Sequence, residues 1–475
     1  MRKQVFFKAF YFLFFLPSIL WSQTIEQTDL VPLPQLAPLP YSEATVNVHG
    51  FNGGLSALNA ASYDTGLNQW LLLGFYRPFF NYIYRENHRF LLRGKWALVQ
   101  YTQDVKIDSV TIERKKLSSS VGSLEVASAE LNFAAQKLTF GRAFYLLGRG
   151  LLFANFADGL QYQRFSFWGD YRLLILYSGE YGKNLCALGI AGCGGQNPYD
   201  IVPGRALDAQ LTNAGRRLFV GGEVTSIPLY GSRISTAVLY SKDFNTQKNL
   251  EGRQFTYEPL YLSFASRGFF LDPRLRYLLE YIYATGNTIN EGPANKKSLI
   301  SAHALLADIF YSLPFLPEKL RALASLQYAF GSGDGDRANG FDAAQVNRNQ
   351  HDNAFYYFGA FAGGFALKPR LTNIHILRPG FLIRPLGNFY AARQLLLSLK
   401  YSYYRKVITD GPISDPRAKE KESFIGHGLD TTISYDFRSD LKFFYAFGLF
   451  APGDAYEKGE RKTRQAHIFS VTLNF

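Results

Sequence analysis

Long apolar runs are what this chain of 475 residues most clearly lacks. After residue 22, no uninterrupted apolar stretch reaches the roughly 20 residues that a membrane-crossing helix requires. No long stretch shows the 3.6-residue periodicity of an amphipathic helix either. These two absences exclude a helical membrane protein and a predominantly helical fold.

Signatures of catalysis and metal binding are also missing. The Gly-x-Ser-x-Gly elbow of hydrolases and the phosphate-binding P-loop do not occur. The seven histidines are scattered, without the His-x-x-x-His spacing of a zinc site. Asp334 and Asp336 begin like a calcium-binding loop, but Ala338 occupies the fifth position, where an oxygen ligand is needed. We therefore predict no enzyme, no metal and no cofactor, with a surface turn at residues 334–336.

Cysteine occurs only twice, as Cys186 and Cys193 in the glycine-rich stretch LCALGIAGCGG. Because an exported protein meets an oxidising compartment, we expect a local disulfide between them. A metal site is disfavoured, since no His, Asp or Glu lies between or beside the two cysteines. Two free thiols in a loop are the alternative, which the distance between the Cα atoms would decide.

Aromatic residues are abundant, with 31 Tyr and 42 Phe, as in β-strands and in the aromatic girdles of membrane barrels. The formal net charge of +13 allows nucleic acid, lipid headgroups or an acidic solute as a partner. Basic residues alternate with apolar ones along extended segments instead of clustering, so we exclude nucleic acid.

The N-terminus has the form of a secretory signal over residues 1–22. Arg2, Lys3 and Lys8 precede an apolar core of about a dozen residues, which is too short for a membrane anchor. Residues 23–43 follow as a proline-rich periplasmic lead-in, because closely spaced prolines cannot pair within a sheet. The remaining residues, 44–475, form the folded domain.

The last eleven residues, QAHIFSVTLNF, alternate strictly between two faces. One face carries Phe469, Val471, Leu473 and Phe475, and the other is largely polar. About ten residues is the length that a tilted strand needs to cross a bilayer. A closing strand that ends in Phe475 resembles the signal read by the machinery that inserts bacterial outer-membrane barrels. We expect this strand to pair with the first strand and close a cylinder.

Several other segments show the same two faces, for example residues 273–286, 394–404 and 428–438. In a barrel the apolar face meets lipid and the charged face lines a wet lumen. At roughly 24 residues per strand and connection, residues 44–475 predict an all-β, antiparallel transmembrane barrel of about 18 strands, within 16–18. Polar stretches such as 104–122, 186–205, 243–255, 331–353 and 406–426 are predicted to be external loops.

Four stretches together resemble the alginate export family of outer-membrane porins. They are KLTFGRAFYLLGRGLLFANFADGLQ (residues 137–161), YAFGSGDGDRANGFD (residues 328–342), LTNIHILRPGFLIRP (residues 371–385) and GHGLDTTISYDFRSDLKFFYAFGLFAPGDAY (residues 426–456). Arg142 matches the family's Gly-Arg pair, although the next residue is Ala143 where the family pattern leads us to expect an amide. Strict alternation would place Arg142 on the lipid face, so a bulge or strand end near Gly141 has to redirect it.

The resemblance implies a barrel of 18 strands that exports an anionic uronate polymer through a lumen lined with Arg and Lys. Arginine binds a carboxylate through its planar fork, which fits a carboxylated sugar. The alternative for each cation is a wet face balanced by internal ion pairs. By alternation and resemblance, the candidate lumen cations are Arg89, Arg93, Lys95, Arg142, Arg172, Arg274, Arg276, Lys319, Arg321 and Lys400, and their acidic partners are Glu130, Glu280, Asp430 and Asp436.

The sequence thus predicts a channel in the bacterial outer membrane that exports an acidic polysaccharide such as alginate. Its expected partners are the solute, membrane lipid, the insertion machinery and periplasmic export proteins. A porin for the uptake of small anions is the first alternative. A barrel-embedded hydrolase would need a catalytic group near the rim, which we do not find, and an adhesin would need longer loops.

Overall fold

The structure is a computed structural model. It describes residues 50–64, 69–84, 88–107, 111–178, 217–244, 256–270, 272–289, 297–337, 340, 351–387, 389, 392–437 and 441–474. The predicted signal and lead-in, both cysteines and Phe475 lie outside these residues, so their assignments stay predictions.

Strands make up nearly all of the secondary structure in the described ranges. No helix among the described residues is long and apolar enough to cross a membrane. The strands are β1 (Gly50–Asp64), β2 (Gln69–Tyr84), β3 (His88–Ile107), β4 (Thr111–Phe133), β5 (Gln136–Leu147), β6 (Phe153–Ser166), β7 (Gly169–Ser178), β8 (Arg217–Ser226), β9 (Ser232–Asp243), β10 (Thr256–Phe269), β11 (Leu275–Ile289), β12 (Lys297–Ser312), β13 (Leu323–Gly331), β14 (His351–Asp352), β15 (Ile374–Ile383), β16 (Leu396–Lys406), β17 (Phe424–Asp436), β18 (Leu441–Pro452) and β19 (Arg464–Asn474). Two short 3-10 turns lie at Glu318–Leu320 and Lys458–Glu460.

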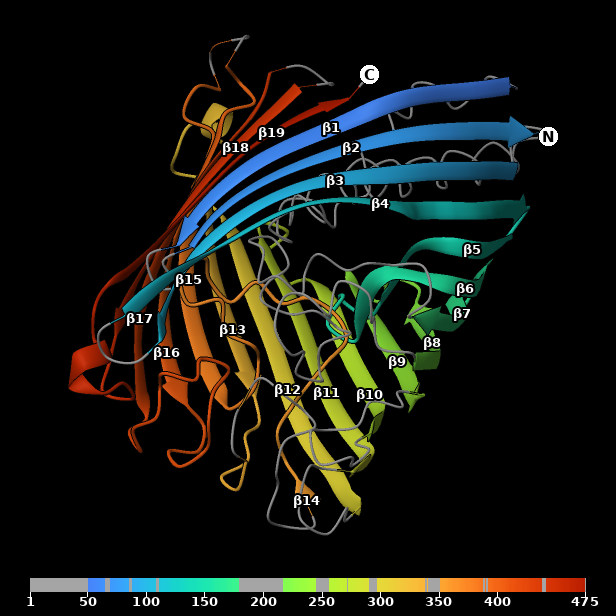
Figure 1. Cartoon of the computed structure of the whole chain (residues 1–475). Helices are drawn as coiled ribbons and strands as arrows, with labels where there is room; N and C mark the ends of the chain where they lie inside the picture. The colour runs from blue at the N-terminus through green and yellow to red at the C-terminus, as the bar shows by residue number, and fades with distance from the viewer. Residues whose placement is uncertain are drawn as a thin grey trace, which may run out of the picture. The chain divides into compact units, whose positions relative to one another are not determined.

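The first and last strands pair with each other and close the sheet. β1 lies antiparallel to β19, from Ser56 opposite Asn474 to Asp64 opposite Ala466 (Figure 1). The two-residue β14 only adds to β12 in parallel, which leaves eighteen antiparallel strands among the described residues as the wall. The predicted fold, strand count and closing pair are therefore confirmed.

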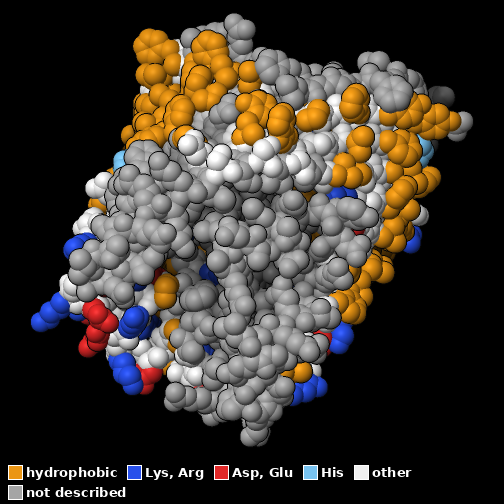
Figure 2. Space-filling model, in the orientation of Figure 1, with side chains coloured by type: hydrophobic (Ala, Val, Ile, Leu, Met, Phe, Trp, Pro, Cys, Tyr) orange, Lys and Arg blue, Asp and Glu red, His pale blue; other side chains and the backbone are white. Residues whose placement is uncertain are grey.

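The wall has an apolar outer face. On β7, Leu173 and Ile175 are 60% and 50% exposed, whereas the alternating Leu174 and Leu176 are buried. Figure 2 shows hydrophobic side chains gathered over the upper and right-hand outer surface. An apolar outer band of this kind faces lipid in a membrane barrel.

The longest connections lie at one end of the wall. Of the connections that the structure describes, residues 353–373, which lie between β13 and β15, and residues 407–423 follow strands that run in the same direction. In bacterial barrels the long connections are extracellular, so we assign this end to the outside. The predicted loop at 104–122 was wrong, because β3 and β4 extend through most of it as one long paired hairpin. The polar residues of this stretch fit the two-residue period of a strand, whereas the loop was predicted from polar composition alone.

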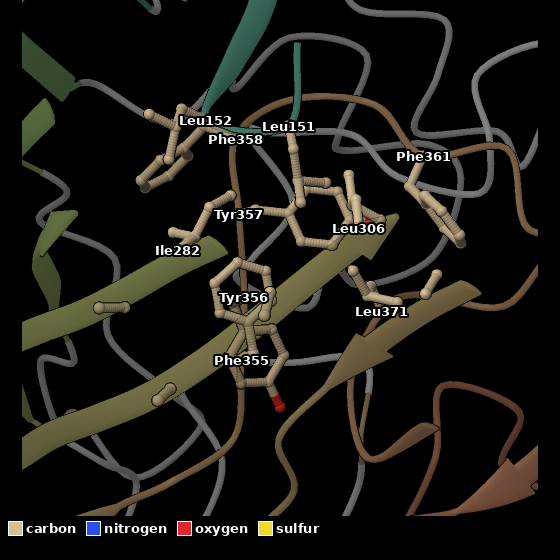
Figure 3. Close-up of a cluster of buried hydrophobic side chains, with 14 of the residues drawn as sticks. Leu151, Leu152, Ile282, Leu306, Phe355, Tyr356, Tyr357, Phe358, Phe361 and Leu371 are labelled. Carbon is tan, nitrogen blue, oxygen red and sulfur yellow. The ribbon is translucent and has the colours of Figure 1, made fainter. Parts of the chain in front are cut away.

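Part of the interior is dry, contrary to the expected wet lumen. Residues 353–373 run between β14 and β15 and bury Phe355, Tyr356 and Phe358 against inward-facing residues of the wall. The turn between β5 and β6 contributes Leu151 and Leu152 to the same cluster (Figure 3). We call residues 353–373 and 148–152 the folded-in segments. The sequence analysis did not predict the folded-in segments. Apolar residues that face the lumen and apolar residues that face lipid follow the same two-residue alternation along a strand, so hydropathy does not show that the interior is filled.

The folded-in segments bond to each other between distant parts of the wall. Gly359 and Ala360 donate backbone hydrogen bonds to Leu151 and Gly150, each at 2.9 Å. Arg149 forms an ion pair with Asp308 of β12, which is six strands from β6 around the wall. These contacts bridge the interior and hold both segments within it.

Replacing Phe358 with Ala should loosen the folded-in segments without opening the wall. Loss of a fully buried Phe side chain costs about 3–5 kcal/mol, whereas the strand hydrogen bonds stay intact. We expect the variant to keep its heat-modifiable gel mobility and to gain protease cleavage within residues 353–373. Phe264, which is 51% exposed on the outer face, gives the matched control F264A. Equal protease resistance of both variants would contradict this packing role.

Candidate functional site

A group of charged side chains from β2, β3 and β4 forms the candidate site. We call Arg77, Arg93, Lys95 and Glu125 the basic cluster. Glu125 Oε2 lies 3.0 Å from Arg77 Nε and 2.8 Å from Arg93 Nε, and all three side chains are nearly inaccessible. Lys95 lies within electrostatic range of the other three and is partly buried.

A β-bulge builds this arrangement. The register between β3 and β4 shifts after Arg93, which faces Val126, while the next residue, Gly94, faces Leu124. Glu125 is therefore the extra residue on β4, and it points into the wall's interior instead of pairing. Bulges redirect a side chain in this way and locally increase the twist of a strand.

Cations outnumber carboxylates among the four residues of the basic cluster. One carboxylate, Glu125, faces the three cations Arg77, Arg93 and Lys95. The Arg93 guanidinium also lies 5.7 Å from the centroid of the Phe156 ring, which provides a cation–π contact. Positive charge between low-dielectric walls produces a stronger field than the same charge on an open surface, and such a field attracts anions.

Arg142 lies on the neighbouring hairpin, with its Nη1 atom 2.9 Å from Asp158 Oδ2. Phe140 is 42% exposed but Arg142 only 8%, although strict alternation would give both side chains the same face. Gly141 between them has a φ of 100°, which glycine adopts without strain. The backbone thus departs from regular alternation at the expected position.

Most other buried arginines are matched by a carboxylate. Such neutral pairs hold the wall and the folded-in segments together, because a buried charge is costly without a partner. The pairs are Arg217 with Asp243, Arg337 with Asp352, Arg378 with Asp430 and Arg464 with Asp415. Arg172, which is partly exposed, pairs with Glu223.

The remaining predicted residues are distributed around the wall, and two pairs of them face each other across neighbouring strands, Arg89 with Glu130 and Lys400 with Asp430. Arg89 donates to Asn81 Oδ1 at 2.8 Å, and Glu130 pairs with Lys137 at 2.9 Å. Buried Glu280 accepts a hydrogen bond from Ser263, and Asp430 accepts one from the backbone of Phe365. The others lie on strands of the wall: Arg172 on β7, Arg276 on β11, and Lys400 on β16 opposite Asp430.

Four predicted lumen positions need correction. Arg274 precedes β11 and lies in the turn after β10, where its exposed side chain pairs with Asp272. Asp436 ends β17, and its carboxylate is half exposed and 3.5 Å from Lys442 Nζ. For Arg274, the prediction extended the two-residue alternation beyond the first residue of β11. Lys319 and Arg321 likewise lie in an exposed connection, not in a strand.

Arg77 and Glu125 escaped the sequence analysis. Pro78 follows Arg77 and obscured the strand pattern, although β2 continues through it. Glu125 is out of phase with Glu130 on the same strand, which in hindsight is the signal of a bulge between them.

The model of the alginate export family matches residues 237–469. Three of the four resembling stretches lie within this range, so the resemblance is confirmed there; the stretch at 137–161 lies outside it. A comparison with curated protein sequences finds no match.

Solved porin structures share the fold of this chain. Acinetobacter baumannii OccAB1 gives a TM-score of 0.53 at 9% identity, covering 90% of this chain and 96% of that one. Pseudomonas aeruginosa OpdQ gives 0.51 at 13% identity, with 90% and 99% covered. Pseudomonas aeruginosa OccK11 (OpdR) gives 0.51 at 11% identity, with 90% and 96% covered. At these identities the likeness concerns the fold alone. With the family match, it shows a channel protein of the bacterial outer membrane and not an enzyme.

Replacing Glu125 with Gln should destabilise the barrel, because it leaves Arg77 and Arg93 buried without their shared counter-charge. Breaking a buried ion pair from one side costs about 3–5 kcal/mol. Urea unfolding of the refolded protein in detergent would measure the loss. The control E130Q makes the same chemical change on β4 at a partly exposed pair and should cost about 1 kcal/mol or less. Equal losses for both variants would refute a special role of Glu125.

Proposed function

We propose that this channel passes an anionic solute, and that the solute is an acidic polysaccharide of the uronate type moving outward. The observation that carries the proposal is the basic cluster, in which three cations surround one carboxylate. The family match over residues 237–469 supports export of an alginate-like polymer. Alginate is a polyuronate, so its carboxylates complement arginine and lysine.

The mechanism is passive attraction followed by release. Positive potential at the basic cluster raises the local concentration of the anion. Arg77 and Arg93 are nearly inaccessible and already bond to Glu125, so the basic cluster attracts a passing sugar carboxylate through its electric field, without a tight direct contact. Weak, exchangeable contacts allow a solute to leave as readily as it enters, which conduction requires.

Lys95→Glu should lower anion selectivity, because it leaves two cations facing two carboxylates. A change of about 1–2 kT in local potential shifts the anion-to-cation permeability ratio roughly threefold to tenfold. Reversal potentials across planar bilayers in a salt gradient measure this ratio. R274E makes the same change in charge at an exposed turn and serves as the control. Cation selectivity of the unmodified channel would falsify the proposal.

A porin for small anions is the second candidate, and the folded-in segments favour it. They occupy part of the interior and tie the β5–β6 turn to β12, which narrows the space left for a polymer. Both candidates use the same basic cluster, so the charge alone does not separate them.

Flux into and out of liposomes separates the two candidates. We expect trapped polyuronate chains to leave vesicles that contain the channel, and neutral glycans of equal length to remain. A polymer exporter should also show current block by added polyuronate. If small organic acids enter while polyuronate neither exits nor blocks, the channel is the small-anion porin.

A further inference from the structure

Four tyrosine–histidine pairs repeat on the last eight strands of the wall. In each pair the tyrosine hydroxyl lies within hydrogen-bond distance of histidine Nδ1 on the adjacent strand, at 2.5–3.0 Å. We call these residues the Tyr–His row. The pairs are Tyr281 with His303, Tyr328 with His375, Tyr401 with His427 and Tyr445 with His467.

Each hairpin builds its pair from the same pattern. A second aromatic residue follows two positions after the tyrosine and lies directly opposite the histidine in the strand register. Its ring centroid is 5.0–5.7 Å from the imidazole centroid, so the histidine packs between two aromatic rings. These second aromatics are Tyr283, Phe330, Tyr403 and Phe447.

The Tyr–His row faces outward. Ala302 and Ala304 on either side of His303 are fully buried, and so are Ile374 and Ile376 on either side of His375. His467 shares its face with Phe469, which is 47% exposed. Since side chains alternate along a strand, the imidazoles project from the outer face of the wall.

The row also stays at one depth in the membrane. On the strand that begins the next hairpin, the cross-strand neighbours of His303, His375 and His427 are Ser332, Arg405 and Ala451. These neighbours lie two, two and four residues beyond the second aromatics of the next pairs, which are Phe330, Tyr403 and Phe447. Strands tilted by 35–45° and spaced about 4.8 Å apart require a stagger of roughly 1–1.5 residues per strand to keep a constant height. Because each step covers two strands, the observed stagger is one residue per strand for the first two steps and two for the third, close to this size. His375, His427 and His467 lie within the first four residues from the extracellular end of their strands.

We assign the tyrosine hydroxyl as the donor to Nδ1 in each pair, which places the histidine proton on Nε2. A tyrosine hydroxyl stays protonated at neutral pH and can donate to Nδ1. A neutral imidazole that accepts at Nδ1 carries its proton on Nε2. Exposed Arg405 lies opposite His375 in the register and adds a positive charge at the same level. The row therefore presents N–H donors and a cation at the extracellular boundary of the apolar band.

We propose that the Tyr–His row is a binding surface for the phosphate groups of the outer-leaflet glycolipid. Phosphate accepts hydrogen bonds from Nε2–H and pairs with Arg405, while the acyl chains lie on the apolar wall below. Donors confined to one depth match a layer of headgroups, and a partner protein would not require a level row. The surface covers only β11–β19, so bound lipid would surround one side of the channel.

Native mass spectrometry of detergent-purified protein titrated with bis-phosphorylated lipid A tests this proposal. We expect at least fivefold weaker lipid binding when His303, His375, His427 and His467 are all replaced with Phe, which keeps the ring packing but removes Nε2–H. The matched control is H88F, because His88 stacks on Tyr84 at the opposite end of the wall. Lipid A stripped of its phosphates should bind the unmodified protein as weakly as intact lipid A binds the fourfold variant.

Three single-residue variants keep the test decisive if the fourfold variant does not fold. Single replacements H375F and H427F should each weaken binding about twofold, and R405Q should do the same through loss of charge. Unchanged affinity in all of them would overturn the proposal, as would equal binding of dephosphorylated lipid. A change in oligomeric state without a change in lipid binding would also overturn it and would assign the row to a contact between copies. Reversal potentials should stay unchanged in every variant, which separates this result from the fate of the proposed function.

Discussion

The pairing of β1 with β19 is the constraint on which the rest of the structure depends. Within a bilayer core, each unpaired backbone N–H or C=O costs several kcal/mol, so a sheet has to leave no edge. Closure from Ser56 opposite Asn474 to Asp64 opposite Ala466 removes the last two edges. The apolar outer face and the shielded interior both follow, because only a closed wall separates lipid from lumen.

Closure also creates an interior that the chain can fill. Two connections on the extracellular side turn inward, and their backbones bond to each other between strands six positions apart. Apolar packing around Phe358, the contact of the Arg217 guanidinium with the Phe358 ring and the ion pair of Arg149 with Asp308 hold them there. Paired charges stabilise this arrangement, whereas the three cations that surround Glu125 provide the positive field that we propose acts on a solute.

Sequence reasoning found part of the candidate site. Alternation identified Arg93 and Lys95, which belong to the basic cluster, and the resemblance identified Arg142, which lies on a neighbouring hairpin. It missed Arg77 and Glu125, because a proline and a bulge break the period of two on which the reasoning depended. It also extended a strand to Arg274, which lies in a turn, since alternation carries no sharp signal for where a strand ends.

By itself the sequence determined that this protein is a closed antiparallel barrel of about 16–18 strands, because hydropathy that alternates every second residue is a local property repeated along the chain. Tertiary structure alone decided what lies inside the wall and which charges meet. The pairing of Glu125 with two arginines, the bridge between Arg149 and Asp308, and the level row of histidines all join residues on different strands. Such contacts depend on register, bulges and strand tilt, which are set only when the barrel closes.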